Sequence, residues 1–315
     1  MSRPSLVRAR APAKVNLRLD VLGPRADGYH DIRTWMLALD RCDHLEARAN
    51  ASGQVTLAVT GEHATADIPA DASNLVHRAA SLALAECRTR GLASDRDGVD
   101  LALEKRIPSR AGLGGGSSDA AAAWFAVGAA LGVELEADGG ALATLGSDCA
   151  FFARARATGF ALCEGRGDRV TAARGPDSSF FVAVVVPEVG CPTAAVYAEL
   201  DRLDGRPQRE PDPPPEWLRG PASRVRPYLR NRLEKAALAA FPELAGWRML
   251  LDESGAIEWR LSGSGSAFFG IHDRREEAET TLAGVVDAAS AKSLAVRAAW
   301  VSAPSGRGVN IVEVR

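Results

Sequence analysis

A run of glycines and serines is the part of the sequence best suited to chemistry. It reads IPSRAGLGGGSSDAAAAW over residues 107–124 and leads into a predicted helix at 120–131, for which Ser117, Ser118 and Asp119 are N-cap candidates. Glycines let the backbone approach a ligand closely, and unpaired N–H groups at a helix start favour a phosphate. The Lys-Ser/Thr of a P-loop and the last glycine of a dinucleotide fingerprint are both missing. The run is interpreted as a phosphate-binding loop, with a flexible approach to a capped helix as the alternative.

A regular alternation near the start of the chain places further polar side chains together. From residue 7 to residue 21 apolar and polar residues alternate without interruption, which predicts a half-buried strand. Its polar face carries Lys14 and Asn16, followed by Arg18 and Asp20. Taken alone, a lysine on a strand face is ordinarily a solvated charge, and an asparagine there is polar surface.

Strands and helices are predicted around these residues in two halves of the chain. In the first half VTLAVTG and VDLALEKRI alternate as strands do, and SNLVHRAASLALAECRTRG has helical spacing. In the second half a strand at 180–187 precedes helical stretches at 230–241 and 274–290 and the closing strands LAVRAAWV and VNIVEV, which together indicate a separate α+β layer. The proline-rich stretch 207–227 is expected to be an irregular surface segment rather than a packed element.

Composition and charge narrow the class of protein. The 315 residues are 46% hydrophobic, which suits one or two ordinary domains, and the formal net charge of -2 gives no support to a nucleic-acid partner. No apolar stretch reaches the length of a membrane span and the N-terminus lacks a signal-peptide run, so a cytoplasmic protein without a membrane partner is expected. Five scattered cysteines without a C-x-x-C pair predict reduced thiols rather than disulfides or a zinc site.

Several blocks of the sequence resemble one enzyme superfamily. PSRAGLGGGSSDAAAAW is similar to the ATP loop of the GHMP kinases, which include galactokinase, homoserine kinase and mevalonate kinase. APAKVNLRLDVLGPRADGYHDIRTWM looks like the N-terminal signature of the 4-diphosphocytidyl-2-C-methyl-D-erythritol kinase branch, as do LGSDCAFF, CPTAAVY, NRLE and LSGSGSAFFG, in the family's order. The chain departs from the family at Cys149-Ala150, where Val-Pro is usual, and at GRGD, where Gly-x-Gly-Glu is common.

The resemblance implies an α+β fold with two domains and an active site in the cleft between them. The N-terminal ATP-binding domain, at 1–167, would resemble the second domain of ribosomal protein S5, and the C-terminal domain, at 168–315, would be a ferredoxin-like α/β layer. ATP with Mg²⁺ would phosphorylate the 2-hydroxyl of 4-diphosphocytidyl-2-C-methyl-D-erythritol, a cytidine-diphosphate-linked polyol of the non-mevalonate isoprenoid route. Two alternatives stay open: a GHMP kinase for mevalonate, homoserine or a sugar, and a non-catalytic nucleotide- or RNA-binding relative.

Catalytic roles follow from the same resemblance. Asp148 would accept or orient the proton of the substrate hydroxyl, and a helix N-cap is its alternative role. Lys14 would lie beside Asp148, keep it ionised and stabilise charge on the transferred group. The Ser118 hydroxyl is a candidate ligand for the metal ion, whose other ligands the sequence does not identify.

Binding residues are carried over in the same way. The ATP loop would comprise Pro108, Ser109, Arg110, Ala111, Gly112, Leu113, Gly114, Gly115, Gly116, Ser117 and Ser118. Asn74 and Lys105 would approach the adenosine, with helix capping and solvent exposure as alternatives. The substrate would contact Asn16, Tyr29, His30, Thr193 and Tyr197, of which Tyr29, His30 and Tyr197 suit a pyrimidine ring. The alternatives are a surface or cap position for His30, core packing for the tyrosines and a helix cap for Thr193. The run from Gly263 to Gly265 would lie at the domain junction or form a tight turn between strands.

Overall fold

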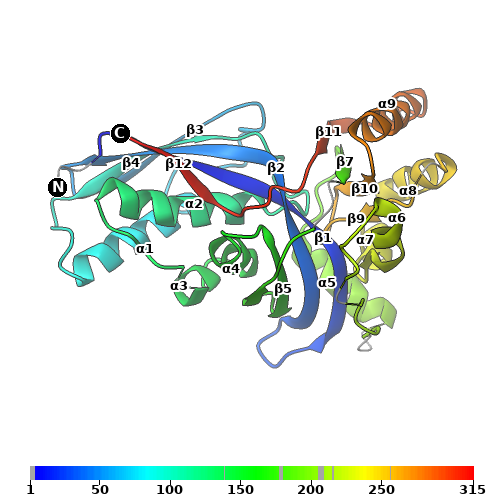
Figure 1. Ribbon diagram of the computed structural model, residues 1–315, viewed down its shortest axis with the longest axis horizontal. Coiled ribbons are helices and arrows are strands. Elements are labelled where there is room, and N and C mark those ends of the chain that lie inside the picture. Colours follow the sequence, from blue (N-terminus) through cyan, green and yellow to red (C-terminus); the bar gives the residue numbers. More distant parts are fainter. Residues whose placement is uncertain (1–3, 138, 177–179, 205–208, 215, 256) are drawn as a thin grey trace.

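Two β-sheets, each with helices packed against it, form the protein (Figure 1). This computed structural model describes residues 4–137, 139–176, 180–204, 209–214, 216–255 and 257–315. The predicted α+β fold of two domains is confirmed. The boundary after residue 167 stays a prediction.

The first sheet has the strand order β12-β1-β2-β4-β3, and β2 is long enough to pair with β5 as well. Its strands are β1 (Val7–Pro24), β2 (His30–Asn50), β3 (Val55–Thr60), β4 (Gly98–Glu104), β5 (Phe160–Gly165), β6 (Arg169–Ala172), β8 (Arg230–Asn231) and β12 (Asn310–Val314). The VNIVEV strand was expected in the second layer, and this expectation is wrong: as β12 it pairs with the start of β1. It supplies main-chain partners to an edge that would otherwise be open.

Helices cover the inner face of this sheet. They are α1 (Leu75–Thr89), α2 (Gly115–Ala130), α3 (Gly139–Ala143) and α4 (Ser147–Arg154). Helix α2 lies between the sheet and α1 (Figure 1), and it is buried because its sequence is apolar on nearly every side. It begins at Gly115 rather than at residue 120, with Gly114 as N-cap at a φ of 71°. The predicted capping by Ser117, Ser118 and Asp119 is therefore wrong, since all three lie inside the helix.

The second sheet, β11-β7-β10-β9, packs between the first sheet and a second group of helices. Its strands are β7 (Phe181–Pro187), β9 (Arg260–Leu261), β10 (Phe268–His272) and β11 (Val296–Ser302). The helices are α5 (Thr193–Asp204), α6 (Ala222–Val225), η1 (Arg226–Tyr228), α7 (Glu234–Ala240), α8 (Glu243–Glu253) and α9 (Arg275–Ala291). The helix expected at 230–241 thus starts only at Glu234, because its first residues form β8. Strand β7 is buried on both faces, with Val185 toward the helices and Val184 toward the first sheet.

Strand β1 changes face along its length although its sequence alternates without a break. Its register with β2 slips just before Lys14 and again after Asn16, and each such β-bulge moves the following side chains to the opposite face. Asn16 therefore shares the helix side with its partner Met36, which packs in the α2 core. Arg18 pairs with Trp35, which packs in the core between the sheets, so Arg18 faces away from Lys14.

The polar side chains of β1 are buried, so the expectation of a half-buried strand is wrong here. Lys14 and Asn16 are 3% and 2% exposed, and Arg18 and Asp20 are 6% and 2% exposed. Buried charges are costly unless they are paired. Arg18 Nε accordingly donates to Asp20 Oδ2 at 3.0 Å on one face, and Lys14 is paired on the other.

The described part of the proline-rich stretch packs into the protein, contrary to expectation. Trp217 and Leu218 are buried in the core between the sheets. The Trp217 ring meets Trp35 edge-on at 6.2 Å and Tyr228 at 6.0 Å. Among the described residues of this stretch the regular elements are the short helices α6 and η1, and its prolines do not keep Trp217 out of the core. Positions 207, 208 and 215 lie outside the described residues.

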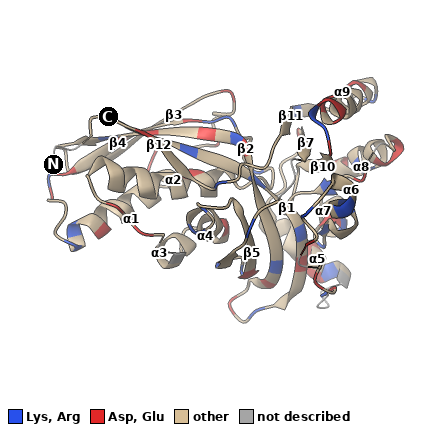
Figure 2. Ribbon diagram, viewed as in Figure 1, with Lys and Arg blue, Asp and Glu red and all other residues tan. Residues whose placement is uncertain are grey.

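The distribution of charged residues, apolar helices and cysteines can be compared with the predictions from the sequence. Basic and acidic residues are interspersed over both layers (Figure 2). Among the described residues no helix is long and apolar enough to cross a membrane. All five cysteines are free thiols in buried positions, in agreement with the sequence.

We expect the protein to lose stability as the pH falls from about 6.5 to 4, in part through His272. Burial, helped by the charge of Arg226 and opposed by Asp273, lowers the pKa of His272 to about 4. The unfolded chain then binds the extra proton between pH 6.5 and 4, so acidification favours unfolding by up to about 3 kcal/mol. Urea denaturation at pH 7 and 4.5 should show a smaller loss in His272→Phe than in the wild type. Equal losses in both proteins would contradict this role.

Candidate active site

The glycine loop, residues 108–116, is fixed by main-chain hydrogen bonds to both domains. Lys14 N on β1 donates to Leu113 O at 2.9 Å. On the opposite side, Ala267 N, in the turn after β9, donates to Ala111 O at 3.1 Å. The loop therefore sits at the junction between the two sheets.

Two positions in this loop require glycine. Gly112 has a φ of 72°, and a Cβ there would collide with the carbonyl oxygen of Ser262. Gly114 has a φ of 71°, and its Cβ would lie 2.9 Å from Lys14 Cγ. Left-handed backbone and close approach are both features that only glycine accommodates without strain.

The start of α2 offers unpaired amides next to the loop. The first helical amide to find an acceptor is Ser118 N, which donates to Gly114 O at 2.9 Å. The amides of Gly115, Gly116 and Ser117 precede it and have no acceptor within the helix. Together with the positive end of the helix dipole they form a site that favours a phosphate.

Lys14 and Asp148 meet beside the loop, as the resemblance implied. Lys14 Nζ lies 3.4 Å from Asp148 Oδ2, and it donates to Asn16 Oδ1 at 2.6 Å and to Gly112 O at 2.9 Å. Asn16 in turn donates to Thr34 Oγ1 at 2.8 Å. Lys14 is almost fully buried, whereas the Asp148 side chain is 26% exposed. The Asp148 carboxylate is thus accessible to a ligand, whereas the Lys14 ammonium is held by its hydrogen bonds to Asn16 and Gly112.

Asp148 is not a helix cap. Helix α4 begins at Ser147 with Gly146 as N-cap, so Asp148 lies in the first turn. Cys149 and Ala150, where the chain departs from the family, are fully buried. This departure leaves the Asp148 carboxylate beside Lys14. Burial raises the pKa of Cys149 to about 12, so this thiol stays protonated.

The second glycine run also reaches Lys14. A Cβ on Gly263 would lie 3.3 Å from Lys14 Nζ and 3.4 Å from Asn16 Oδ1. Asn231 Nδ2 donates to Gly263 O at 2.7 Å and so holds this turn in place. Both interpretations offered by the sequence hold, because this run forms the turn between β9 and β10 and lies against Lys14 of the first sheet.

A buried ion network supports the glycine loop, and the sequence did not identify it. Lys105 pairs with Asp43 and, at 2.7 Å, with Asp119, and all three are at most 3% exposed. Asp43 also accepts the amide of Ile107 at 2.8 Å, where the loop begins. Burial lowers the pKa of Lys105, but the charges of Asp119 and Asp43 outweigh it and raise the pKa. The alternative of a solvent-exposed Lys105 is therefore wrong, and its approach to the adenosine stays a prediction.

Asn74 and the outer loop residues are placed by other contacts. Asn74 Oδ1 caps α1 by accepting from Val76 N at 2.8 Å, which is the capping role named as its alternative. Arg297 Nη1 donates to Ser109 O at 2.8 Å. Arg110 has a side chain that is 64% exposed. Whether Asn74 approaches a nucleotide stays a prediction.

His30 and Tyr197 come together at the other end of the site. Their rings lie 4.7 Å apart, and His30 Nε2 is 2.8 Å from Asp201 Oδ1. Burial and the charge of Asp148 raise the pKa of Tyr197, so its hydroxyl stays protonated. Tyr29 is 57% exposed, and the Arg166 guanidinium lies 5.0 Å from the centre of its ring.

Thr193, at the start of α5, connects this region to the second glycine run. Its Oγ1 lies 3.0 Å from Ser264 Oγ. The structure thus brings Thr193 to the segment that also contacts Lys14.

The sequence matches two family profiles and several named kinases. Residues 74–161 match the profile described as GHMP kinases N terminal domain, and residues 218–290 match GHMP kinases C terminal. A 4-diphosphocytidyl-2-C-methyl-D-erythritol kinase of Pelotomaculum thermopropionicum is 36% identical over 281 residues, covering 88% of this chain and 93% of that protein. One of Geobacter sulfurreducens is 37% identical over 292 residues, covering 91% and 97%.

Solved structures agree with the sequence relatives. A crystal structure of 4-(cytidine 5'-diphospho)-2C-methyl-D-erythritol kinase is 32% identical, with a TM-score of 0.71 over 94% of this chain and 98% of that one. Homoserine kinase from Cytophaga hutchinsonii shares the fold, with a TM-score of 0.68 over 99% of both chains at 18% identity. The chain is therefore a small-molecule kinase of the GHMP superfamily and belongs to the 4-diphosphocytidyl-2-C-methyl-D-erythritol kinase family.

Proposed function

We propose that this protein transfers the γ-phosphoryl group of ATP to the 2-hydroxyl of 4-diphosphocytidyl-2-C-methyl-D-erythritol. The observation that carries the proposal is the position of Asp148, which is open to a ligand, pairs with Lys14 and adjoins the glycine loop. The names of the relatives supply the substrate.

Asp148 and Lys14 divide the work of the reaction. The Asp148 carboxylate accepts the proton of the substrate hydroxyl as its oxygen forms a bond to the γ-phosphorus. The bond from that phosphorus to the β–γ bridging oxygen breaks, and ADP leaves. Lys14 is held in place by Asn16 and Gly112, and its ammonium stabilises negative charge between the two reactants. Because both groups are already positioned, little reorganisation is needed when the substrates bind.

The glycine loop and the start of α2 are the proposed phosphate site for ATP. The amides of Gly115, Gly116 and Ser117 would donate to phosphate oxygens. Ser118 Oγ is buried and lacks a hydrogen-bond partner among the described residues, so it suits one position around Mg²⁺. No group of three or more acidic, His or Cys side chains in the described chain could hold a metal, so phosphates and water would complete the shell. When bound, Mg²⁺ would neutralise phosphate charge.

ADP release with ATP and Mg²⁺ tests the proposal directly. The purified protein should turn over the cytidyl-methylerythritol substrate and not mevalonate, homoserine or galactose. Turnover confined to one of the other alcohols would keep the kinase and overturn the substrate. ATP binding without turnover of any substrate would favour the non-catalytic alternative.

The substrate region predicts a specific effect of Tyr29→Ala. An exposed tyrosine ring can stack on a pyrimidine base, and such stacking contributes about 1–3 kcal/mol. We expect the KM for the cytidyl substrate to rise roughly five- to a hundredfold, with a smaller change in kcat. Steady-state kinetics should show a near-normal KM in Tyr29→Phe, which keeps the ring. An unchanged KM in Tyr29→Ala would remove this residue from the pocket.

A further inference from the structure

An arginine-lined cavity lies beside β8, and its lining residue Asn231 also holds the Gly263 turn next to Lys14. Its volume is about 650 Å³, within the range of sites for small organic molecules. Its charged lining residues are Arg18, Glu210, Arg230, Arg232, Glu234, Lys235 and Arg260. It shares no lining residue with the glycine loop, Lys14 or Asp148. Arg18 reaches it because the β-bulge after Asn16 turns this side chain to the face opposite Lys14.

Arg18, which lines this cavity, has a guanidinium nitrogen without a hydrogen-bond partner among the described residues. The residue is 6% exposed, and its Nε donates to Asp20 at 3.0 Å. Its Nη2 has no hydrogen-bond partner within the part of the chain that the structure describes. Buried polar groups are nearly always hydrogen-bonded, so an open donor on a buried guanidinium indicates a missing acceptor.

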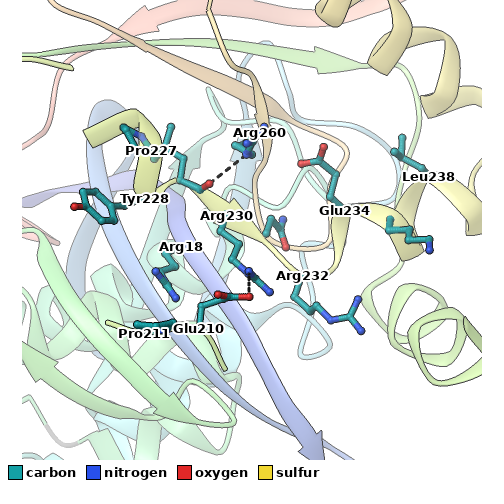
Figure 3. Close-up of a pocket in the computed structure, with 13 residues that line it drawn as sticks. Arg18, Glu210, Pro211, Pro227, Tyr228, Arg230, Arg232, Glu234, Leu238 and Arg260 are labelled. Atoms are coloured by element: carbon teal, nitrogen blue, oxygen red, sulfur yellow. Dashed lines mark hydrogen bonds and ion pairs between the residues drawn. The ribbon is translucent and has the colours of Figure 1, made fainter. Parts of the chain in front are cut away.

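Arg230 lines the cavity, and two carboxylates of this chain bind it. Arg230 Nε lies 3.1 Å from Asp20 Oδ1 and Nη1 lies 2.7 Å from Glu210 Oε1. Figure 3 shows Glu210 and Arg230 pointing toward each other across the cavity. The Glu210 side chain is 51% exposed on an irregular segment, so it can leave without disturbing the core.

We infer that this cavity binds a small organic anion that carries a phosphate or diphosphate group. Arginine forks match phosphate oxygens in pairs, and four arginines line this cavity. Apolar walls from Pro211, Pro227, Leu229 and Leu238 leave room for an organic body. The anion displaces the Glu210 carboxylate from Arg230 when it binds. The site is separate from the kinase reaction, so its test does not depend on turnover.

Binding of inorganic pyrophosphate to variant proteins tests this inference. Calorimetry is done on the full chain with saturating ADP, which competes for any phosphate site at the glycine loop. Glu210→Gln removes the internal competitor and should tighten pyrophosphate binding several-fold. Arg230→Gln removes charged hydrogen bonds and should weaken it about tenfold or more. Unchanged affinity in both variants would overturn the inference.

Matched controls separate the cavity from general charge effects. Glu188→Gln, an exposed glutamate at the end of the second-sheet strand β7, changes the charge equally and should leave the affinity unchanged. If it tightens binding as much as Glu210→Gln does, the cavity has no special role. Citrate has a similar charge without phosphate and should bind more weakly than pyrophosphate. Equal affinity for citrate would overturn the phosphate class.

Discussion

Asp148→Asn should lower kcat about 10²- to 10⁴-fold, the usual effect of removing a general base. The amide has the shape of the carboxylate but cannot accept a proton from the substrate hydroxyl. Lys14 keeps its hydrogen bonds to Asn16 and to Gly112, so the site should stay folded. Pre-steady-state and steady-state ADP release with the cytidyl substrate would measure the loss.

Two companion measurements keep this prediction specific. ATP affinity should change little, because the proposed phosphate amides lie on α2 rather than on α4. Thermal unfolding should also stay close to the wild type, since the Asp148 side chain is 26% exposed and at the site surface. A variant with near-normal kcat would show that positioning by the loop and Lys14 suffices. Asp148 would then lose its role as the base.

The residues proposed to contact the substrates were easier to predict than the buried residues that hold the glycine loop in place. Lys14, Asp148 and the glycines stand in motifs, and the structure brings all of them together. Asp119 was placed at a helix cap because aspartate favours that position. Asp119 stands in an otherwise apolar segment of the sequence, and this could have indicated a buried ion pair. A charged residue on a buried helix needs a partner of opposite charge.

The topology of β1 could not be predicted from its pattern. Unbroken alternation from residue 7 to residue 21 indicates one polar and one apolar face. The β-bulges before Lys14 and after Asn16 invert the faces, and a bulge depends on the partner strand rather than on the strand's own sequence. The bulge after Asn16 separates Lys14 from Arg18, and so the candidate active site from the arginine-lined cavity. Trp217 likewise packs because Trp35 and Tyr228 offer it a surface, which local composition does not reveal.

Lys105→Met should destabilise the protein by about 3–5 kcal/mol, the usual cost of breaking a buried ion pair. The substitution keeps an unbranched side chain of similar length but leaves Asp43 and Asp119 without their shared cation. Burial already raises the pKa of Asp119 well above its usual value, with Lys105 opposing. Loss of Lys105 should therefore leave Asp119 protonated, while Asp43 keeps the amide of Ile107. Urea denaturation at pH 7 measures the loss.

Lys292→Met is the matched control for this prediction, because Lys292 is 46% exposed and its partner Glu253 lies on the surface. Its loss should cost about 0.5 kcal/mol or less. Adding Asp119→Leu to Lys105→Met removes one of the unpaired carboxylates and should recover part of the stability. The glycine loop begins at the residues that Asp43 holds, so Lys105→Met should also weaken ATP binding. Equal stability of the two lysine variants would show that the three buried groups are not a coupled ionic network.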